Sequence, residues 1–558
     1  MGIALTTLRS FHGGVHPADN KSLSAHRPIE RLPLPKMLYV PLHQHLGTPC
    51  EPCVKPGDKV LKGDLIGEAQ GFVSVPVHAP TSGTVLEIKQ HTVGHPSGFT
   101  MLCVVIEPDG RDMWRSDLVG IKTPLQVDPS EIKKKIQEAG IVGLGGATFP
   151  SHIKMSPPKG KVVSLLLING VECEPYLTCD ARLMQERARE IVLGITIMMH
   201  ALQTKECVIG IEANKPMAIS AMRKVVDEFQ QIKVAVLPVM YPQGAEKQLI
   251  EVVTGRQVPS GGLPIDVGVI VHNVATAVAI REAVEFGRPL ISRLVTVTGK
   301  GVKSTANLEV LLGTPVQDLI NFCGGLTYKT KKVIMGGPMM GTALHNLEAP
   351  VVKGTSGILA LTSDETTFQQ KEQNCIRCGS CLKVCPIRLM PCEMAWHSKH
   401  ENLDALKEYN LFDCIECGSC AFVCPAHIPL VHYFRFGKIS ILAQKQADQA
   451  KQKVKERSQR KEARIAKEEA EKERKKAEMK AQSDARKAQA AMTAAQQTAE
   501  SKPSETAKAE TPVSQEAPTS GGTISEDDDK SVRAARAAKA AAAARAAKEA
   551  RDAKTDAN

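Results

Sequence analysis

Cys375-x2-Cys378-x2-Cys381-x3-Cys385-Pro386 and Cys414-x2-Cys417-x2-Cys420-x3-Cys424-Pro425 are two copies of one pattern. In such a run, three closely spaced thiolates hold three corners of a [4Fe–4S] cube, and the fourth cysteine ligates the other cluster. The predicted ligands of one cluster are Cys375, Cys378, Cys381 and Cys424. Those of the other are Cys414, Cys417, Cys420 and Cys385. Two neighbouring clusters carry electrons and form no substrate site, so the remaining sequence must indicate where electrons enter and leave.

A disulfide framework and a pair of zinc sites are the alternatives for these cysteines. Disulfides fit poorly, because residues 1–21 show no secretory signal and reduced thiols point to the cytosol. Zinc sites generally use two CxxC pairs with a long spacer, not three cysteines with a distant Cys-Pro. Histidines occur nearby, but all eight expected cysteine ligands are present, so no histidine ligand is predicted.

The bulk composition indicates several domains and a distinct tail. A chain of 558 residues with 42% hydrophobic residues can form three or four packed domains. Much of the net charge of +11 lies in a C-terminal tail almost free of aromatic residues, which argues against nucleic-acid binding. No apolar run reaches the roughly 18–20 residues that span a bilayer, so no direct membrane span is expected.

The N-terminal part predicts a small β domain. Residues 1–36 are loop-like, and residues 37–115 read as short strands separated by turns. This second stretch resembles a biotinyl/lipoyl-type barrel-sandwich hybrid, a family that carries a modified lysine at a hairpin tip. The corresponding region, 69–75, has no lysine. We therefore expect a structural or docking domain and not a swinging carrier.

Residues 125–285 alternate strand and helix patterns, which predicts an α/β domain with a parallel sheet. The expected strands are Lys161–Ile168, Glu206–Ile211 and Lys233–Val239. The expected helices are Pro129–Glu138, Arg182–Leu202 and Met217–Gln230.

A glycine-rich loop follows the first of these helices. Gly143, Gly145 and Gly146 would let a ligand approach the backbone closely, and Lys154 could neutralise an anion. The loop is neither a GxGxxG fingerprint nor a Walker A motif. Taken alone, it predicts a phosphate-binding loop or a tight helix–strand turn.

Two motifs together carry a resemblance. Gly143-x-Gly-Gly-Ala-x-Phe-Pro-x3-Lys154 and Asn169-x2-Glu-x-Glu-Pro175 resemble the flavoprotein subunit of respiratory complex I, which binds FMN and NADH there. The similarity continues through Gly244-Ala-Glu246 and Val271–Thr276. With the barrel in front and the double cysteine run behind, residues 5–435 resemble the C-subunit family of Rnf (Rsx) electron transport complexes.

The resemblance implies roles for individual residues. FMN would be bound by Gly143, Gly145, Gly146, Lys154, Asn169, Glu172, Gly244 and Asn273. NADH would be contacted by Phe149, Glu174 and Glu246, the implied catalytic residues. There are departures from the complex I pattern. Val142 and Leu144 stand in place of arginines, Val171 in place of an acidic residue, Ala245 in place of a glutamate and Thr148 in place of a glycine.

The remaining segments complete a multidomain architecture. Residues 290–350 resemble a β-grasp module, with Gly336–Gly341 expected as a turn. Residues 365–436 predict an α-helical ferredoxin domain. Residues 440–558 predict a charged low-complexity tail, helical over 451–490, disordered over 501–530 and helical on a partner over 535–550.

The resemblance also implies a function. The chain would be an oxidoreductase subunit, peripheral on the cytoplasmic face of a bacterial inner membrane. It would accept electrons from NADH through FMN and pass them through two [4Fe–4S] clusters to partner subunits, including a ferredoxin-type iron–sulfur subunit. The whole complex would couple this transfer to ion translocation. The alternative is a non-catalytic electron-transfer and docking subunit with a degenerate flavin site. A lipoyl-like carrier is a third possibility.

Overall fold

The computed structural model describes residues 9–95, 97–158, 160–366 and 371–497. The chain divides into two compact units, Met1–Val454 and Lys455–Asn558. The segments predicted to be disordered over 501–530 and helical over 535–550 lie outside the described residues. In the part of the chain that is described, no helix combines the length and the apolar character needed to cross a membrane.

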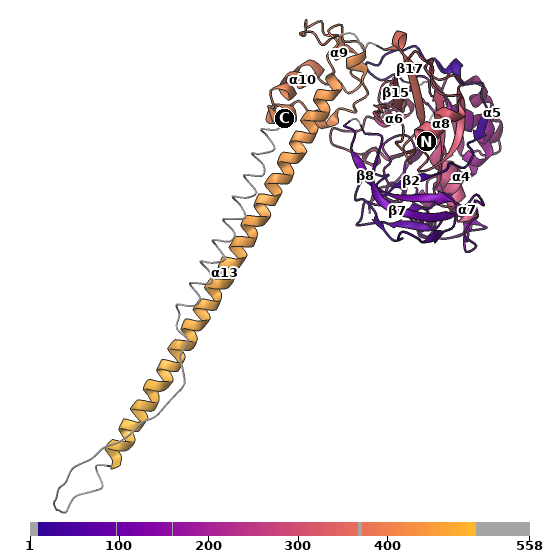
Figure 1. Ribbon diagram of the computed structural model, residues 1–558. Helices are drawn as coiled ribbons and strands as arrows, with labels where there is room; N and C mark the ends of the chain where they lie inside the picture. The colour runs from indigo at the N-terminus through magenta and orange to yellow at the C-terminus, as the bar shows by residue number, and fades with distance from the viewer. Residues whose placement is uncertain (1–8, 96, 159, 367–370, 498–558) are drawn as a thin grey trace, which may run out of the picture. The chain divides into compact units, whose positions relative to one another are not determined.

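The expected barrel-sandwich is present in the first unit. Its strands form a four-stranded sheet of order β2-β8-β7-β4 and a three-stranded sheet of order β3-β5-β6. Fully buried side chains such as Leu38, Ile66 and Ile106 fill the space between them. Figure 1 shows β2, β7 and β8 side by side. The strands are β2 (Leu38–Pro41), β3 (Glu51–Pro52), β4 (Lys59–Val60), β5 (Leu65–Glu68), β6 (Val77–His78), β7 (Gly83–Thr92) and β8 (Thr100–Pro108).

The α/β domain contains a fully parallel sheet of order β11-β10-β9-β12, as predicted. Its strands are β9 (Leu165–Asn169), β10 (Cys207–Glu212), β11 (Ile232–Leu237) and β12 (Val269–Asn273). Both faces of β10 are buried, which is the rule for a central parallel strand. The helices are α1 (Pro129–Glu138), α2 (Ser151–Lys154), α3 (Cys179–Glu186), α4 (Ala188–Leu202), α5 (Pro216–Val226), α6 (Glu246–Thr254) and α7 (Val274–Phe286).

Two predicted helices differ from the structure, because the helix expected over Met217–Gln230 ends at Val226 and the helix expected over Arg182–Leu202 is divided. The pattern over Arg182–Leu202 predicts a single helix, but α3 ends and α4 begins around Arg187, whose φ of −128° and ψ of 34° are not helical. The Arg187 guanidinium donates to Glu309 Oε2 at 2.6 Å in a strand of the next domain. This long-range ion pair accompanies the break, and the helical periodicity of the local sequence does not reveal it.

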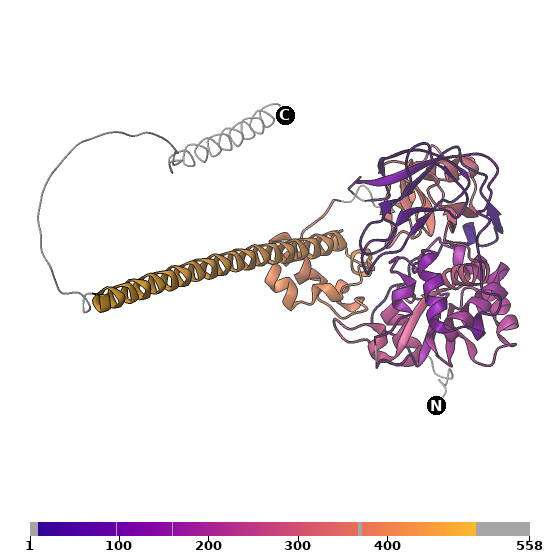
Figure 2. The same ribbon diagram turned by 90° about the horizontal axis from the view of Figure 1, so that it is seen from below.

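The β-grasp module forms a six-stranded sheet of order β1-β14-β13-β17-β15-β16. The predicted N-terminal loop contributes to it, since β1 pairs in parallel with β14. In Figure 2 this module and the barrel lie on one side of the unit and the magenta α/β domain on the other. The elements are β1 (Ile29–Arg31), β13 (Ser292–Thr298), β14 (Ala306–Leu311), α8 (Val316–Phe322), β15 (Thr330–Met335), β16 (Thr342–Ala343) and β17 (Gly357–Thr362).

The cysteine-rich segment is α-helical. Its elements are α9 (Ser380–Lys383), α10 (Pro391–Lys399), α11 (Leu403–Glu408), α12 (Ser419–Phe422) and the start of α13 (Leu430–Gln497). Leu430, Phe434 and Ile441 of α13 are buried in the core of this segment. From residue 455 on, the described side chains of α13 are exposed, with i,i+4 ion pairs such as Arg464–Glu468. The helix predicted over 451–490 is therefore confirmed.

A buried lysine joins three domains of the first unit. Lys353, which follows the β-grasp strand β16, is fully buried. Its Nζ donates to the carbonyl oxygens of Pro76 in the barrel, at 3.0 Å, and of Gly140 after α1, at 2.7 Å. Burial lowers the pKa of Lys353 to about 7, because the ammonium form loses its hydration.

Lys353→Met should lower the apparent melting temperature, since it leaves two buried carbonyl oxygens without a donor, at about 1–3 kcal/mol each. The folded pKa of Lys353 lies below its value in the unfolded chain. Above about pH 7 the unfolded state therefore binds more protons, and the lysine contributes more stability as pH rises. Differential scanning fluorimetry from about pH 7 to about pH 9 should show a widening gap between wild type and variant.

The exposed Lys122 offers the matched control, and Lys122→Met should melt like wild type at each pH. A constant gap between wild type and Lys353→Met across this pH range would contradict the assigned protonation state.

Candidate functional site

The glycine-rich loop forms a closed turn with an exposed tip. The Gly143 N–H donates to Phe149 O at 2.8 Å, and Val142 bridges Pro150 at its base. Gly145 and Gly146 are exposed, and a Cβ placed on Gly146 would meet no heavy atom within 4 Å. The loop therefore presents its backbone to open space beside α2, the arrangement that a phosphate-bearing cofactor requires.

Four of the residues implied to bind FMN form one hydrogen-bonded network at the carboxyl ends of β9 and β12. Asn169 Nδ2 donates to Gly244 O at 2.8 Å. Asn273 Nδ2 donates to Asp180 Oδ2 at 2.6 Å, and Asn273 Oδ1 caps α7 by accepting from Ala275 N. Since parallel neighbours end at the same edge of a sheet, the fold brings together residues about a hundred positions apart in the sequence.

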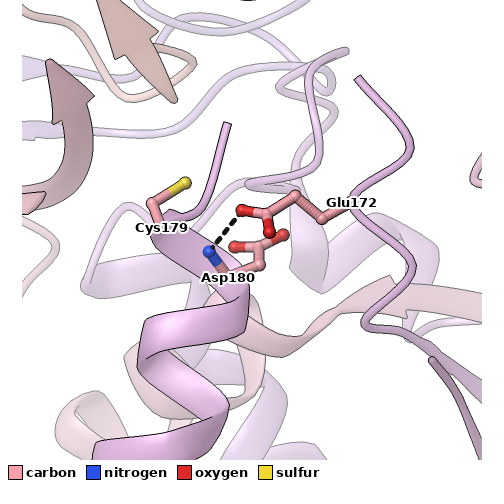
Figure 3. A group of neighbouring side chains, drawn as sticks. All are labelled: Glu172, Cys179 and Asp180. Carbon is pink, nitrogen blue, oxygen red and sulfur yellow. Dashed lines mark hydrogen bonds between the residues drawn. The ribbon is translucent and has the colours of Figure 1, made fainter. Parts of the chain in front are cut away.

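Glu172, the fourth member, points to the first turn of α3. Its carboxylate accepts from Asp180 N at 2.7 Å (Figure 3). It also accepts from Ala181 N at 3.3 Å. One ligand atom from each of Glu172, Cys179 and Asp180 lies within 4.8 Å of the others. Burial raises the pKa of Glu172 to about 7. The Glu172 carboxylate is therefore hydrogen-bonded within the protein. It holds the flavin-motif loop, residues 169–175, against α3.

Lys21 belongs to this site but was not predicted. It is buried, and its Nζ donates to Glu174 O at 2.8 Å and to Leu177 O at 2.6 Å. Burial is the larger effect on this group and lowers the pKa of Lys21, although the attraction of Glu172 favours the charged form. Lys21 lies in a loop-like N-terminal segment without periodicity, so no local signal marks it.

Lys154 and Glu246 form an ion pair beside the loop. Next to them His272 is buried, and neither of its ring nitrogens has a hydrogen-bond partner among the described residues. Burial lowers the pKa of His272 well below its usual range, and the charge of Lys154 adds to this effect. An open backbone loop, a cation and an orphaned polar ring fit a phosphate-bearing heterocycle such as FMN.

The Glu174 carboxylate binds the turn expected at Gly336–Gly341. Its carboxylate accepts from Met339 N at 3.1 Å and from Met340 N at 2.9 Å. A Cβ on Gly337 would clash with Glu174 Oε2, so the turn approaches the carboxylate closely. Burial raises the pKa of Glu174 to about 7. The structure therefore places Glu174 between the flavin-motif loop and the β-grasp module.

The departures from the complex I pattern have structural counterparts. Val142 and Leu144, in place of arginines, are buried in the main core of the α/β domain. Val171 is buried in the core on the opposite face of the sheet. Thr148 has a φ of 50°, a left-handed conformation that suits the glycine of the related pattern better than a β-branched residue. The first two substitutions exchange charge for apolar packing.

Cysteines of both repeats line one apolar cavity. Its walls include Cys385 of the first repeat and Cys414, Cys417 and Cys420 of the second, with Met394 and Phe434. These four cysteines are one of the two ligand sets expected from the sequence. An apolar cavity lined by four cysteines fits a [4Fe–4S] cluster, whose ligands are cysteine thiolates.

The other expected ligands lie nearer to solvent. Cys375 and Cys378 are exposed, and Cys381 and Cys424 are partly buried. Helices α9 and α12, next to the last two cysteines, are in contact. A ninth thiol, Cys392, lies near Cys381.

All sixteen cysteines are free thiols in this structure. Among the described residues, no three cysteine sulfurs lie within 4.8 Å of one another.

The cysteine cavity contacts the flavin-motif side of the α/β domain. Tyr241, which follows β11, is buried, and its Oη donates to Cys417 O at 2.7 Å. Val15 pairs with Tyr241 through both backbone bonds, and Gly14 N donates to Val384 O. An N-terminal strap therefore lies between the two domains. Neither Tyr241 nor Val15 carries a motif, and only the tertiary contacts show their place.

Comparison with known families assigns a description to each domain in turn. Residues 9–111 match the RnfC barrel sandwich hybrid domain, and residues 136–282 match the Nuo51 FMN-binding domain. Residues 294–343 match the SLBB domain, and residues 365–428 match the 4Fe-4S dicluster domain. These matches confirm the expected domain types in their expected order. They also confirm FMN and [4Fe–4S] clusters as the cofactors.

Curated relatives extend over most of the chain. The C subunit of the proton-translocating ferredoxin:NAD(+) oxidoreductase complex of Clostridium ljungdahlii is 48% identical over 445 residues, which cover 80% of this chain and 96% of the relative. The C subunit of the ion-translocating oxidoreductase complex of Rhodobacter capsulatus is 47% identical over 430 residues, covering 77% and 82%. The corresponding subunit of Serratia proteamaculans is 46% identical over 433 residues, covering 78% and 61%.

Glu174→Gln should loosen the 336–341 turn, because a carboxamide presents one acceptor and one donor to two N–H groups. Loss of one such bond, worth about 1.5 kcal/mol, should speed hydrogen exchange at Met339 and Met340 about tenfold. Exchange mass spectrometry of peptides covering residues 336–341 measures this effect. Glu348→Gln, at an exposed position in the same domain, is the control. Unchanged exchange in Glu174→Gln would show that the carboxylate does not hold the turn.

Proposed function

Because this chain belongs to the RnfC family, the C subunits of ion-translocating oxidoreductase complexes, we propose that it takes electrons from NADH and passes them to partner subunits. One of these partners is a ferredoxin-type iron–sulfur subunit. Family membership and the matched domains make the chain an electron-transfer subunit with FMN and [4Fe–4S] clusters. The donor, the partner and a location on the cytoplasmic face of the inner membrane belong to the proposal.

One observation carries it. The loops that bear the flavin motifs lie against the cavity of Cys385, Cys414, Cys417 and Cys420, joined by the hydrogen bond from Tyr241 Oη to Cys417 O. A domain that only supported the complex would not require its nucleotide motifs to abut a cluster site. The contact favours one continuous path for electrons.

In this proposal the open glycine loop and Lys154 hold the phosphate of FMN, and the network of Asn169, Gly244 and Asn273 supports the ring. Bound FMN would supply hydride acceptance and release of electrons one at a time. Phe149 and Glu246 contact NADH at the same edge of the sheet. Glu174 contributes by holding the turn beside them, since its carboxylate accepts from that turn.

A second function, a non-catalytic docking subunit whose flavin site is degenerate, is favoured by one specific observation. Val142 and Leu144 are buried apolar residues in place of two arginines. Loss of these charges lowers the attraction for a nucleotide.

Anaerobic NADH titration of the purified protein separates these two functions. We expect extractable FMN, iron and sulfide, and bleaching of both flavin and cluster absorbance by NADH. Lys154→Gln should lower the flavin content, because it removes the cation next to the loop, whereas Lys161→Gln, 48% exposed, should not. If the protein contains iron–sulfur clusters but no FMN, and NADH does not bleach its absorbance, the electron-transfer function from NADH is wrong and the docking function is supported.

Cys385→Ala should remove the cluster whose other ligands are Cys414, Cys417 and Cys420, because it lines the same cavity. EPR of the dithionite-reduced protein should show selective loss of that signal. Cys392→Ala is the control and should retain both signals. Selective loss of the cluster of Cys375, Cys378 and Cys381 in Cys385→Ala would instead indicate that each repeat ligates a cluster on its own.

A further inference from the structure

We infer that the outer cysteine loop, residues 375–378, and the cations Arg377 and Lys383 form a docking face for an acidic electron-carrier domain. The inference rests on the proposed function and adds the place where electrons leave and the chemistry of the partner. It comes from comparing the two cysteine loops, which share one conformation but have different surroundings.

The two loops are nearly the same in sequence and backbone. Cys375-Ile-Arg-Cys378-Gly-Ser-Cys381 and Cys414-Ile-Glu-Cys417-Gly-Ser-Cys420 differ only at Arg377 and Glu416. These two residues have φ values of 54° and 55°. Each backbone N–H lies 3.4 Å from the sulfur of the first cysteine in its loop. The difference between the loops is therefore one of surroundings and charge.

The corresponding loop of the second repeat, residues 414–417, is called the inner loop. It is covered by other parts of the first unit. Cys417 is buried with Tyr241 and Val15, and Ile415 packs against this cluster. A Cβ on Gly418 would lie 2.9 Å from Met339 O. Glu416 is used internally, as its carboxylate accepts from Arg435 and Lys438 of α13, both at 2.8 Å. The inner loop is therefore already engaged by contacts within the chain.

The outer loop has no such cover from the described residues. Cys375, Ile376, Arg377 and Cys378 are all exposed, and Ile376 is 69% exposed. An electron carrier must approach a cluster closely, because electron tunnelling falls steeply with distance. Two exposed ligands make this loop the place where a partner can come nearest, with Ile376 as an apolar contact at the centre.

Charge identifies the kind of partner. Residues 371–390 contain four basic residues, Lys371, Arg377, Lys383 and Arg388, and one acidic residue, Glu372. Glu372 is paired with Lys399. Arg377, Lys383 and Arg388 are exposed and form no ion pair with any described residue between 9 and 497. The corresponding residues 410–429 of the second repeat contain two acidic residues, Asp413 and Glu416, and no lysine or arginine.

Unpaired cations around an exposed redox site attract an acidic surface and raise the association rate. Electron-transfer complexes bury small interfaces and dissociate readily, so a few cations and one apolar residue suffice. The occupant is therefore an acidic iron–sulfur domain that carries its own cluster.

Arg377→Glu tests the inference with little risk to the fold, because it reproduces the sequence that the inner loop already has. The probe is an acidic two-cluster bacterial ferredoxin, immobilised for surface plasmon resonance with the holoprotein as analyte. Wild type should bind with an affinity that falls about tenfold or more from low to physiological salt. Arg377→Glu/Lys383→Glu should bind at least about tenfold more weakly. Lys59→Glu, an exposed charge reversal on the barrel, should bind like wild type.

EPR of each variant verifies that both clusters are present. Equal binding of wild type and the double variant, or binding independent of salt, would overturn the inference. So would binding to anionic phospholipid vesicles but not to the ferredoxin. NADH bleaching is measured separately on the same variants and should be unchanged. If bleaching fails while the salt-dependent binding persists, the NADH assignment fails and the docking face remains.

Discussion

The parallel pairing of β9 with β10 and β12 is the constraint on which the functional part of this protein depends. Parallel strands end at one edge of their sheet, so the loops after β9, β11 and β12 must all begin there. Those loops carry Asn169 to Glu174, Tyr241 to Gly244, and Asn273. The grouping of the residues predicted to bind the cofactor, and their contact with the cysteine cavity, follow from that single edge. A change of strand order would separate them even if every motif were kept.

Three other parts of the chain, the β-grasp module, the barrel and the N-terminal strap, make polar contacts with the α/β domain. The β-grasp turn binds the Glu174 carboxylate, the barrel and the α/β domain meet on Lys353, and the N-terminal strap lies between Tyr241 and Val384. Each contact joins a polar group to a partner in another domain, and in the case of Lys353 that group is fully buried. Such groups are costly to bury alone, so each domain stabilises its neighbours in one arrangement.

The sequence was informative where a local pattern carries the chemistry. The repeated cysteine spacing predicts the cluster ligands, because the cluster itself fixes that spacing, and the structure places four of these cysteines around one cavity. The alternation of strands and helices in the α/β domain was likewise readable, since buried parallel strands need continuous apolar runs. The local pattern does not reveal where each of these elements ends, as the break at Arg187 shows. Lys21, Tyr241 and Lys353 could not be found this way, because their importance comes from contacts more than a hundred residues distant. Only the structure shows that the two cysteine loops share one backbone conformation and differ in burial.

The shared cavity of Cys385 and the second repeat has a consequence for biosynthesis. A ribosome that has released the first repeat alone has produced only one wall of that cavity, and Tyr241 has as yet no Cys417 to bond. The flavin domain, in contrast, is complete in sequence well before either cysteine repeat is translated. The order of the chain therefore means that the nucleotide-binding part is synthesised first, whereas this cavity can receive iron and sulfide only after Cys420 has been synthesised.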